Sequence, residues 1–100
     1  MDTLFILQKL KMDNTLKQLQ TIPGVGPKLS KEFFGIGIKD ISDLKGKNPE
    51  ELYLRICANQ RCQVDRCVLY VCRSSVYFAE NKNPDPEKLK WWNWKDEKLQ

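Results

Sequence analysis

The chain has 100 residues, of which 41% are hydrophobic, and its formal net charge is +4. This length suits a single small domain with one hydrophobic core. A charge of +4 is compatible with a polyanionic partner but does not by itself indicate one. The apolar run near the N-terminus, LFIL, has only four residues, whereas a membrane helix needs about 20. We therefore expect no secretory signal, no membrane contact and a cytoplasmic protein.

The first predicted helix covers residues 14–20. Leu16 and Leu19 lie three residues apart, and Asp13 or Asn14 is a suitable N-terminal cap. The helix should end before Pro23. For residues 1–13 three alternatives stay open: an extra helix, an oligomer contact or disorder.

The second predicted helix covers residues 27–36. Pro27 is favoured in a first helical turn, and Leu29 and Phe33 are spaced to share one face. Gly35 or Gly37 should end the helix in the left-handed conformation.

Two short elements follow. Asp40 is expected to cap a single turn that carries Ile41 and Leu44. Asn48 should cap a helix over residues 49–59, which begins with Pro49 and two acidic residues. Its predicted apolar face is made by Leu52 and Ile56, with Leu54 or Cys57.

The longest helix is predicted over residues 64–80. Its apolar stripe at helical spacing consists of Val64, Val68, Val71, Cys72, Ser75 and Ala79. The many β-branched residues would also suit a strand, but the length and the period favour a helix. A last short helix should begin at Pro86. The sequence thus predicts an all-α, compact bundle of five or six short helices.

The four cysteines, Cys57, Cys62, Cys67 and Cys72, lie at intervals of five. A structural zinc site usually takes two ligands from a C-x-x-C turn, and here there is neither such a turn nor any histidine. We favour ordinary buried thiols over a redox pair, and either of these over a metal site.

The segment TIPGVGPKLSKEFFGIG, residues 21–37, is the main functional candidate. Gly24 and Gly26 permit positive φ and leave the backbone uncovered, while Pro27 starts a helix without losing an amide donor. The free amides at such a helix start make an anion site, to which Lys28 and Lys31 would add charge. Glycines in tight interhelical turns also occur for steric reasons alone.

A larger pattern contains this segment: an apolar residue before PGVGPK, two aromatic residues, GI, a gap of three residues and SDL. Over about residues 15–45 it resembles the helix-hairpin-helix motif of DNA-repair and replication proteins. That resemblance implies a grip on the DNA backbone that does not read bases. The implied phosphate-binding residues are Gly24, Val25, Gly26, Lys28 and Lys31.

The same resemblance implies a monovalent cation, K⁺ or Na⁺, at the turn. The matching ligands would be the carbonyls of Gln20, Ile22 and Val25. We expect no other cofactor or metal.

The segments GIKDISDLKGKNPEELYLRIC, VDRCVLYVCRSSVYFA and LKWWNWKD are similar to the small bacterial "pathogenicity locus" proteins, which are single-domain helix-hairpin-helix (SAM-like) chains. The resemblance covers about residues 14–96. It implies one domain over 14–96, with residues 1–13 as an extension and 97–100 as a tail. The second hairpin would be degenerate, because its turn, NQRCQV, contains no glycine.

A candidate for a second contact face lies on the longest helix, where Arg66, Tyr70, Arg73 and Tyr77 recur at helical spacing. Alternating guanidinium and aromatic groups hold phosphates and stack on bases. The alternative, which we favour, is that the tyrosines pack against WWNW while the arginines pair with Asp65, Glu80 or acids of the tail.

The three tryptophans, Trp91, Trp92 and Trp94, are expected to lie on the core, with at least two of them buried. One left exposed would contact a base or a partner protein.

These observations favour sequence-independent DNA binding, in an accessory role in DNA repair or recombination. The alternative is a protein-interaction or adaptor module that keeps the hairpin only as architecture. A single hairpin is a weak clamp, so we expect a protein partner or self-association as well. We do not expect an enzyme, because the sequence offers no histidine, no paired carboxylates and no evident nucleophile with a base.

Overall fold

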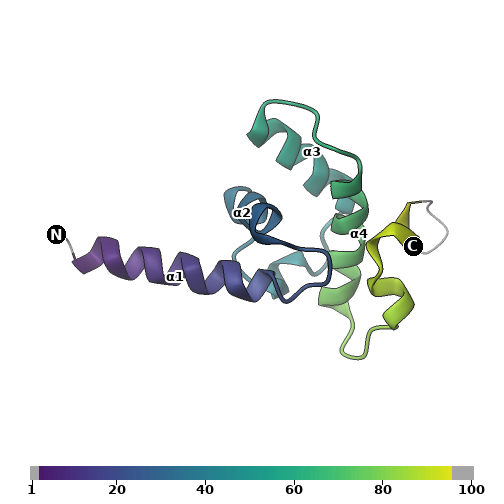
Figure 1. Ribbon diagram of the computed structural model, residues 1–100, viewed down its shortest axis with the longest axis horizontal. Coiled ribbons are helices and arrows are strands. Elements are labelled where there is room, and N and C mark those ends of the chain that lie inside the picture. The colour runs from purple at the N-terminus through teal and green to yellow at the C-terminus, as the bar shows by residue number, and fades with distance from the viewer. Residues whose placement is uncertain (1–2, 96–100) are drawn as a thin grey trace.

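The computed structural model describes residues 3–95 (Figure 1). This part of the chain is all-helical, as predicted, and contains no strand. The predicted five or six helices correspond to four α-helices and three single-turn 3₁₀ helices. In chain order they are α1 (Thr3–Leu19), α2 (Pro27–Gly35), η1 (Ile41–Leu44), α3 (Pro49–Gln60), α4 (Cys67–Glu80), η2 (Pro86–Leu89) and η3 (Trp91–Trp94).

Helix α1 is much longer than predicted. The expected start at Asp13 or Asn14 is wrong, because the helix already begins at Thr3 and runs through both residues. Only Leu16 and Leu19 near its C-terminal end are buried. Figure 1 shows the N-terminal half projecting away from the other helices. Residues 3–13 are therefore a helical extension, the first of the three alternatives.

The N-terminal caps predicted at Asp40 and Asn48 are confirmed. Asn48 Oδ1 accepts hydrogen bonds from the amides of Glu50 (2.9 Å) and Glu51 (3.2 Å), and Asp40 accepts from the amide of Ser42 (3.0 Å). Helix α2 ends at Gly35, and Gly37 has a φ of +97°. Local polar and glycine signals therefore set these helix ends.

The core lies where α2, η1, α3 and α4 meet. Phe33, Leu44, Ile56 and Cys72 are completely buried there, one from each of these elements. Leu54 is wrongly placed by the sequence analysis, since it lies on the outer side of α3 and is 64% exposed. Its place on the inner side is taken by Tyr53.

The hydroxyl of Tyr53 donates a 2.6 Å hydrogen bond to the carbonyl of Val64. This bond ties α3 to the segment before α4, which begins at Cys67 and not at residue 64 as predicted. Between the two helices Arg61 adopts the left-handed conformation, with a φ of +58°, at a position where glycine would be the usual residue.

The C-terminal segment folds back along α4 (Figure 1). Arg73 is 3% exposed and donates from Nη1 to the carbonyl of Trp94 (2.7 Å) and from Nη2 to Glu50 (2.9 Å). The Trp94 indole donates to the carbonyl of Lys88 (2.7 Å), and its ring lies 5.6 Å from that of Tyr77. Arg73 thus connects α4 with α3 and η3.

No helix within residues 3–95 has both the length and the apolar content needed to cross a bilayer.

Candidate functional site

The turn between α1 and α2 is fixed to the core by two apolar side chains. Ile22 and Val25 are 1% and 5% exposed, and the amide of Val25 donates to the carbonyl of Ile22 (3.0 Å). Gly24 lies between them with a φ of +90°, so its predicted positive φ is confirmed. A Cβ at Gly24 would lie 3.0 Å from Cδ1 of Trp91. Both backbone conformation and packing therefore require glycine at this position.

Gly26 is different. As the N-terminal cap of α2 it has extended dihedral angles, φ −96° and ψ −172°, which any residue can adopt. A Cβ built at Gly26 meets no heavy atom within 4 Å. The positive φ permitted by the sequence is thus not used here. Nothing inside the described chain accounts for a glycine, and a bare backbone facing open space is what a closely approaching ligand needs.

The amides at this helix start are available. Within residues 3–95, the amides of Gly24, Gly26, Lys28 and Leu29 make no hydrogen bond to protein atoms, whereas the Gly26 carbonyl accepts from the amide of Ser30 (3.0 Å). Pro27 has no amide hydrogen. Free N–H groups and the positive end of the helix dipole together favour an anion at this point.

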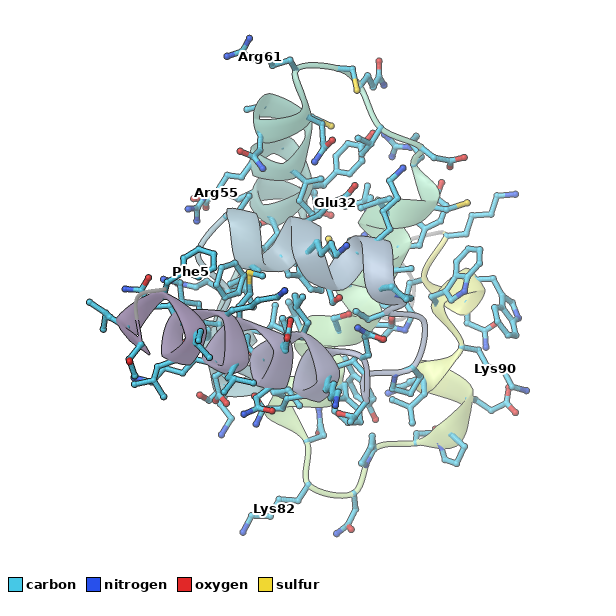
Figure 2. The ribbon with its side chains drawn as sticks, turned by 60° about the vertical axis from the view of Figure 1, so that its left-hand side comes forward. Phe5, Glu32, Arg55, Arg61, Lys82 and Lys90 are labelled. Atoms are coloured by element: carbon cyan, nitrogen blue, oxygen red, sulfur yellow. The ribbon has the colours of Figure 1, made fainter. Side chains whose placement is uncertain are left out.

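The side-chain charges around the turn have both signs. Lys28 and Lys31 are exposed on α2. Glu32 is 7% exposed and lines a hollow of about 340 Å³ together with Gly26, Lys28 and Asp65. Figure 2 shows Glu32 on α2, the same helix that carries the two lysines. The negative charge of Glu32 reduces the attraction for an anion, so the site is only moderately electropositive.

A monovalent cation on the turn carbonyls is chemically compatible with the structure. The carbonyl of Ile22 accepts the Val25 amide, and it keeps a second lone pair for an ion. With Gln20 and Val25 it would present neutral oxygens, which suit K⁺ or Na⁺. Within residues 3–95 no cluster of His, Cys, Asp or Glu could hold a metal ion.

The predicted contact face on α4 does not form as a continuous surface. Arg66 is exposed and precedes the helix, while Arg73 is buried and bonded to Glu50 rather than to Asp65, Glu80 or tail acids. Tyr77 contacts Trp94, as the structural alternative predicted. Tyr70 lies beneath the Arg73 guanidinium, 5.7 Å from it. Arg73 and Tyr77 therefore serve mainly to hold the C-terminal segment.

The cysteines do not form one group. Cys72 is completely buried, and its burial raises the pKa of the thiol to about 12. Cys57 and Cys67 are half-buried and Cys62 is exposed. The neighbouring Asp65 carboxylate raises the pKa of Cys67. The prediction of ordinary buried thiols holds for Cys72 only.

The tryptophans also differ from the prediction that at least two are buried. Trp94 is buried, Trp91 is half-buried against the core, and Trp92 is 56% exposed. Trp91 reaches Gly24 of the turn, a contact between residues far apart in the sequence. No spacing signal in the chain could have indicated that contact.

Comparison with known proteins identifies the family to which the chain belongs. The model of the Pathogenicity locus family matches residues 12–100. The chain is also 34% identical over 80 residues to a Streptomyces lavendulae protein named mitomycin resistance protein McrB, a match that covers 80% of this chain and 72% of that one. No solved structure matches. The chain is therefore a member of the Pathogenicity locus family.

Proposed function

We propose that the chain binds DNA independently of sequence, by holding backbone phosphates at the turn of residues 24–28. In this proposal α1, the turn and α2 form a helix-hairpin-helix unit. The observation that carries it is Gly26: a glycine that neither conformation nor packing requires, next to free amides and Lys28 at the start of a helix. Amides and lysines recognise phosphate without reading bases.

The same physics sets the strength of binding. Two or three phosphate contacts give a slope of log K against log salt of roughly −2 to −3, and non-specific affinities lie around 10⁻⁴–10⁻⁶ M. A single clamp of this kind suits an accessory factor in DNA repair or recombination rather than an independent DNA-binding protein. A cation on the carbonyls of Gln20, Ile22 and Val25 would stiffen the turn.

The test is a titration of fluorescent duplex and single-stranded DNA at several salt concentrations. We expect Lys28→Glu with Lys31→Glu to abolish binding. The matched control is Lys45→Glu with Lys82→Glu, which makes the same change in net charge away from α2; Figure 2 shows Lys82 in the loop that follows α4. Equal binding by both double variants, or no binding by the native chain at low salt, would contradict the proposal.

A second candidate function, protein association, is favoured by the surface of α1. Its N-terminal half exposes a set of large apolar side chains: Leu4, Phe5, Ile6, Leu7, Leu10 and Met12. Four of these residues are consecutive and so point to every side of the helix. A helix with large apolar side chains on several sides is normally covered by another element or chain.

We propose a second copy of this chain as the partner, with the two α1 helices antiparallel. A hollow of about 470 Å³ lies beside α1, lined by Phe5, Gln8, Lys9, Met12 and Phe34. A two-fold axis between residues 8 and 9 places Phe5 opposite Met12 of the partner, and Gln8 opposite Lys9. The lining is thus self-complementary, as a symmetric dimer requires.

The charge at the centre of this pairing sets its salt dependence. Lys9 of both copies would lie near the axis, so their repulsion would be screened by salt. Association should therefore strengthen with salt, whereas DNA binding should weaken.

Sedimentation over a range of protein concentrations tests this association. We expect Phe5→Glu to give a monomer and Lys9→Gln to tighten the dimer, while Leu54→Glu, at an equally exposed position on α3, changes nothing. A native chain that stays monomeric at high concentration and high salt would show that α1 does not pair with itself.

A further inference from the structure

The exposed Trp92 lies close to the phosphate-binding turn. Trp91 contacts Gly24, with its Cδ1 3.0 Å from the position of a Cβ there. The ring of Trp92 stands edge-on to that of Trp91, with 5.6 Å between their centroids. Only one indole therefore separates Trp92 from the turn. In Figure 2 the turn between α1 and α2 faces the C-terminal segment that carries both rings.

Trp92 is held in place although its ring is exposed. The η3 turn is fixed on one side by the bond from Arg73 to the carbonyl of Trp94. On the other side the Asn93 side chain donates to the carbonyl of Glu87 (2.8 Å). The backbone amide of Asn93 donates to the carbonyl of Lys90 (2.9 Å). The chain thus presents a large flat ring to solvent from an ordered backbone, which lowers the entropy cost of stacking on it.

We infer that Trp92 stacks on an unpaired base of the strand whose phosphate is held at Gly26 and Lys28. This inference rests on the proposed function, and it names the class of DNA: single strands, or duplexes with an unpaired stretch. A ring beside a backbone clamp reaches the face of a base only where that base is unpaired and unstacked, because a duplex hides those faces. Base stacking on an indole is sequence-tolerant, as the clamp is.

The charges around Trp92 fit such a strand. Lys90 and Lys95 flank η3 and both are exposed, although Lys90 is paired with Glu87 at 3.0 Å. Figure 2 shows Lys90 on the C-terminal segment. Lys90 and Lys95 thus add positive charge at both ends of the turn that carries the two indoles, as an anionic strand requires.

The experiment measures binding of an oligothymidine strand and of a duplex of equal length, by fluorescence anisotropy and by quenching of tryptophan emission. We expect Trp92→Ala to weaken binding of the single strand roughly tenfold or more and to leave duplex binding unchanged. Trp92→Phe should restore most of the loss. Leu54→Ala, which also removes an exposed apolar side chain, is the matched control.

The outcomes separate the two proposals. Equal single-strand binding by Trp92→Ala and the native chain, while Lys28→Glu with Lys31→Glu abolishes binding, overturns the stacking inference alone. Equal weakening on both DNAs by Trp92→Ala also overturns it, since the ring would then act without an unpaired base. Absence of binding to either DNA by the native chain overturns the phosphate clamp and the stacking together.

Discussion

Two glycines two residues apart have different physical roles in this chain. Gly24 has a φ of +90°, and its missing side chain leaves room for Trp91, so it serves the fold. Gly26 has an extended backbone and open space where a side chain would be. Only Gly26 is therefore open to a ligand. Substituting alanine at Gly24 and at Gly26 in turn separates the two roles.

We expect Gly26→Ala to leave the free energy of unfolding within about 1 kcal/mol of the native value, while a methyl group at the helix start weakens DNA binding. Gly24→Ala should destabilise by more than about 1 kcal/mol, because the new side chain must adopt positive φ and meets Trp91. Urea unfolding and DNA titration of both variants measure this. Unchanged DNA binding by Gly26→Ala would remove the main support for the phosphate clamp.

Cys72 gives a pH dependence with a definite sign. Burial raises the pKa of its thiol to about 12, above the value of an exposed thiol. Its contribution to stability is therefore complete below the unfolded pKa, near 8.5–9, and is lost as the pH rises toward 12. The expected slope is about 1.4 kcal/mol per pH unit. Burial raises the pKa of Tyr53 as well, which acts in the same direction at higher pH.

Urea titrations at several pH values between 8 and 10.5 measure this slope. Cys72→Ala should flatten it, and Cys62→Ser, which replaces an exposed thiol, should not. A slope that is the same in Cys72→Ala and in the native chain would assign the alkaline transition to other groups.

At the scale of the elements, Arg73 is the main connection between helices and the C-terminal segment. Its guanidinium bonds to Glu50 at the start of α3 and to the carbonyl of Trp94 in η3. Because Arg73 is 3% exposed and Glu50 is about half exposed, the two sides of the ion pair are not equivalent. Losing the guanidinium leaves the buried Trp94 carbonyl without this donor, whereas neutralising Glu50 removes a charge that solvent already screens in part.

We expect Arg73→Ala to lower the free energy of unfolding by roughly 2–4 kcal/mol and to shift tryptophan emission to the red as η3 loosens. Arg73→Lys should recover only part of the loss, since an amine lacks the planar fork. Glu50→Gln should lower the free energy of unfolding by less than about 1 kcal/mol, because the Glu50 side chain is about half exposed to solvent. Equal losses for Arg73→Ala and Glu50→Gln would mean that the ion pair, and not the bond to Trp94, holds the segment.

At the scale of the whole molecule, the projecting half of α1 adds little to the core. The buried residues of this helix are Leu16 and Leu19, and the family match begins at residue 12. We expect a chain that starts at residue 12 to unfold within about 1 kcal/mol of the native chain and to keep its near-UV circular dichroism. It should also be monomeric. Loss of cooperative unfolding would show that residues 3–11 belong to the folding unit.

Much of the fold follows from local signals. Asn48 with Pro49, Asp40, Pro27 and Gly37 set helix ends, because a cap or a left-handed residue acts through neighbouring backbone groups. The start of α1 has no such signal, so the sequence leaves a helix over residues 1–13 as one of three alternatives. The predicted position of the phosphate site depends on the same local signals in residues 21–37.

What the sequence could not supply are the distant contacts. The partner of Arg73 is Glu50, 23 residues away. Asp65 and Glu80 are nearer in the sequence, and their spacing makes them equally plausible partners for an ion pair. Likewise Trp91 packs on Gly24 only because the C-terminal segment returns along α4. Helical periodicity gives the face of a residue but does not choose among several partners for that face.

The contact of Trp91 with Gly24 also has a consequence for how the chain acquires its structure during synthesis. The turn that contains Gly24 is synthesised well before the ring of Trp91, which packs on it. The carbonyl bound by Arg73 belongs to Trp94, so the buried guanidinium likewise lacks this partner until residue 94 has been added. We therefore expect this part of the core to close only after residues 91–94 have emerged from the ribosome. A nascent chain that stalled before residue 91 would expose the apolar side of α4 to aggregation and to chaperones.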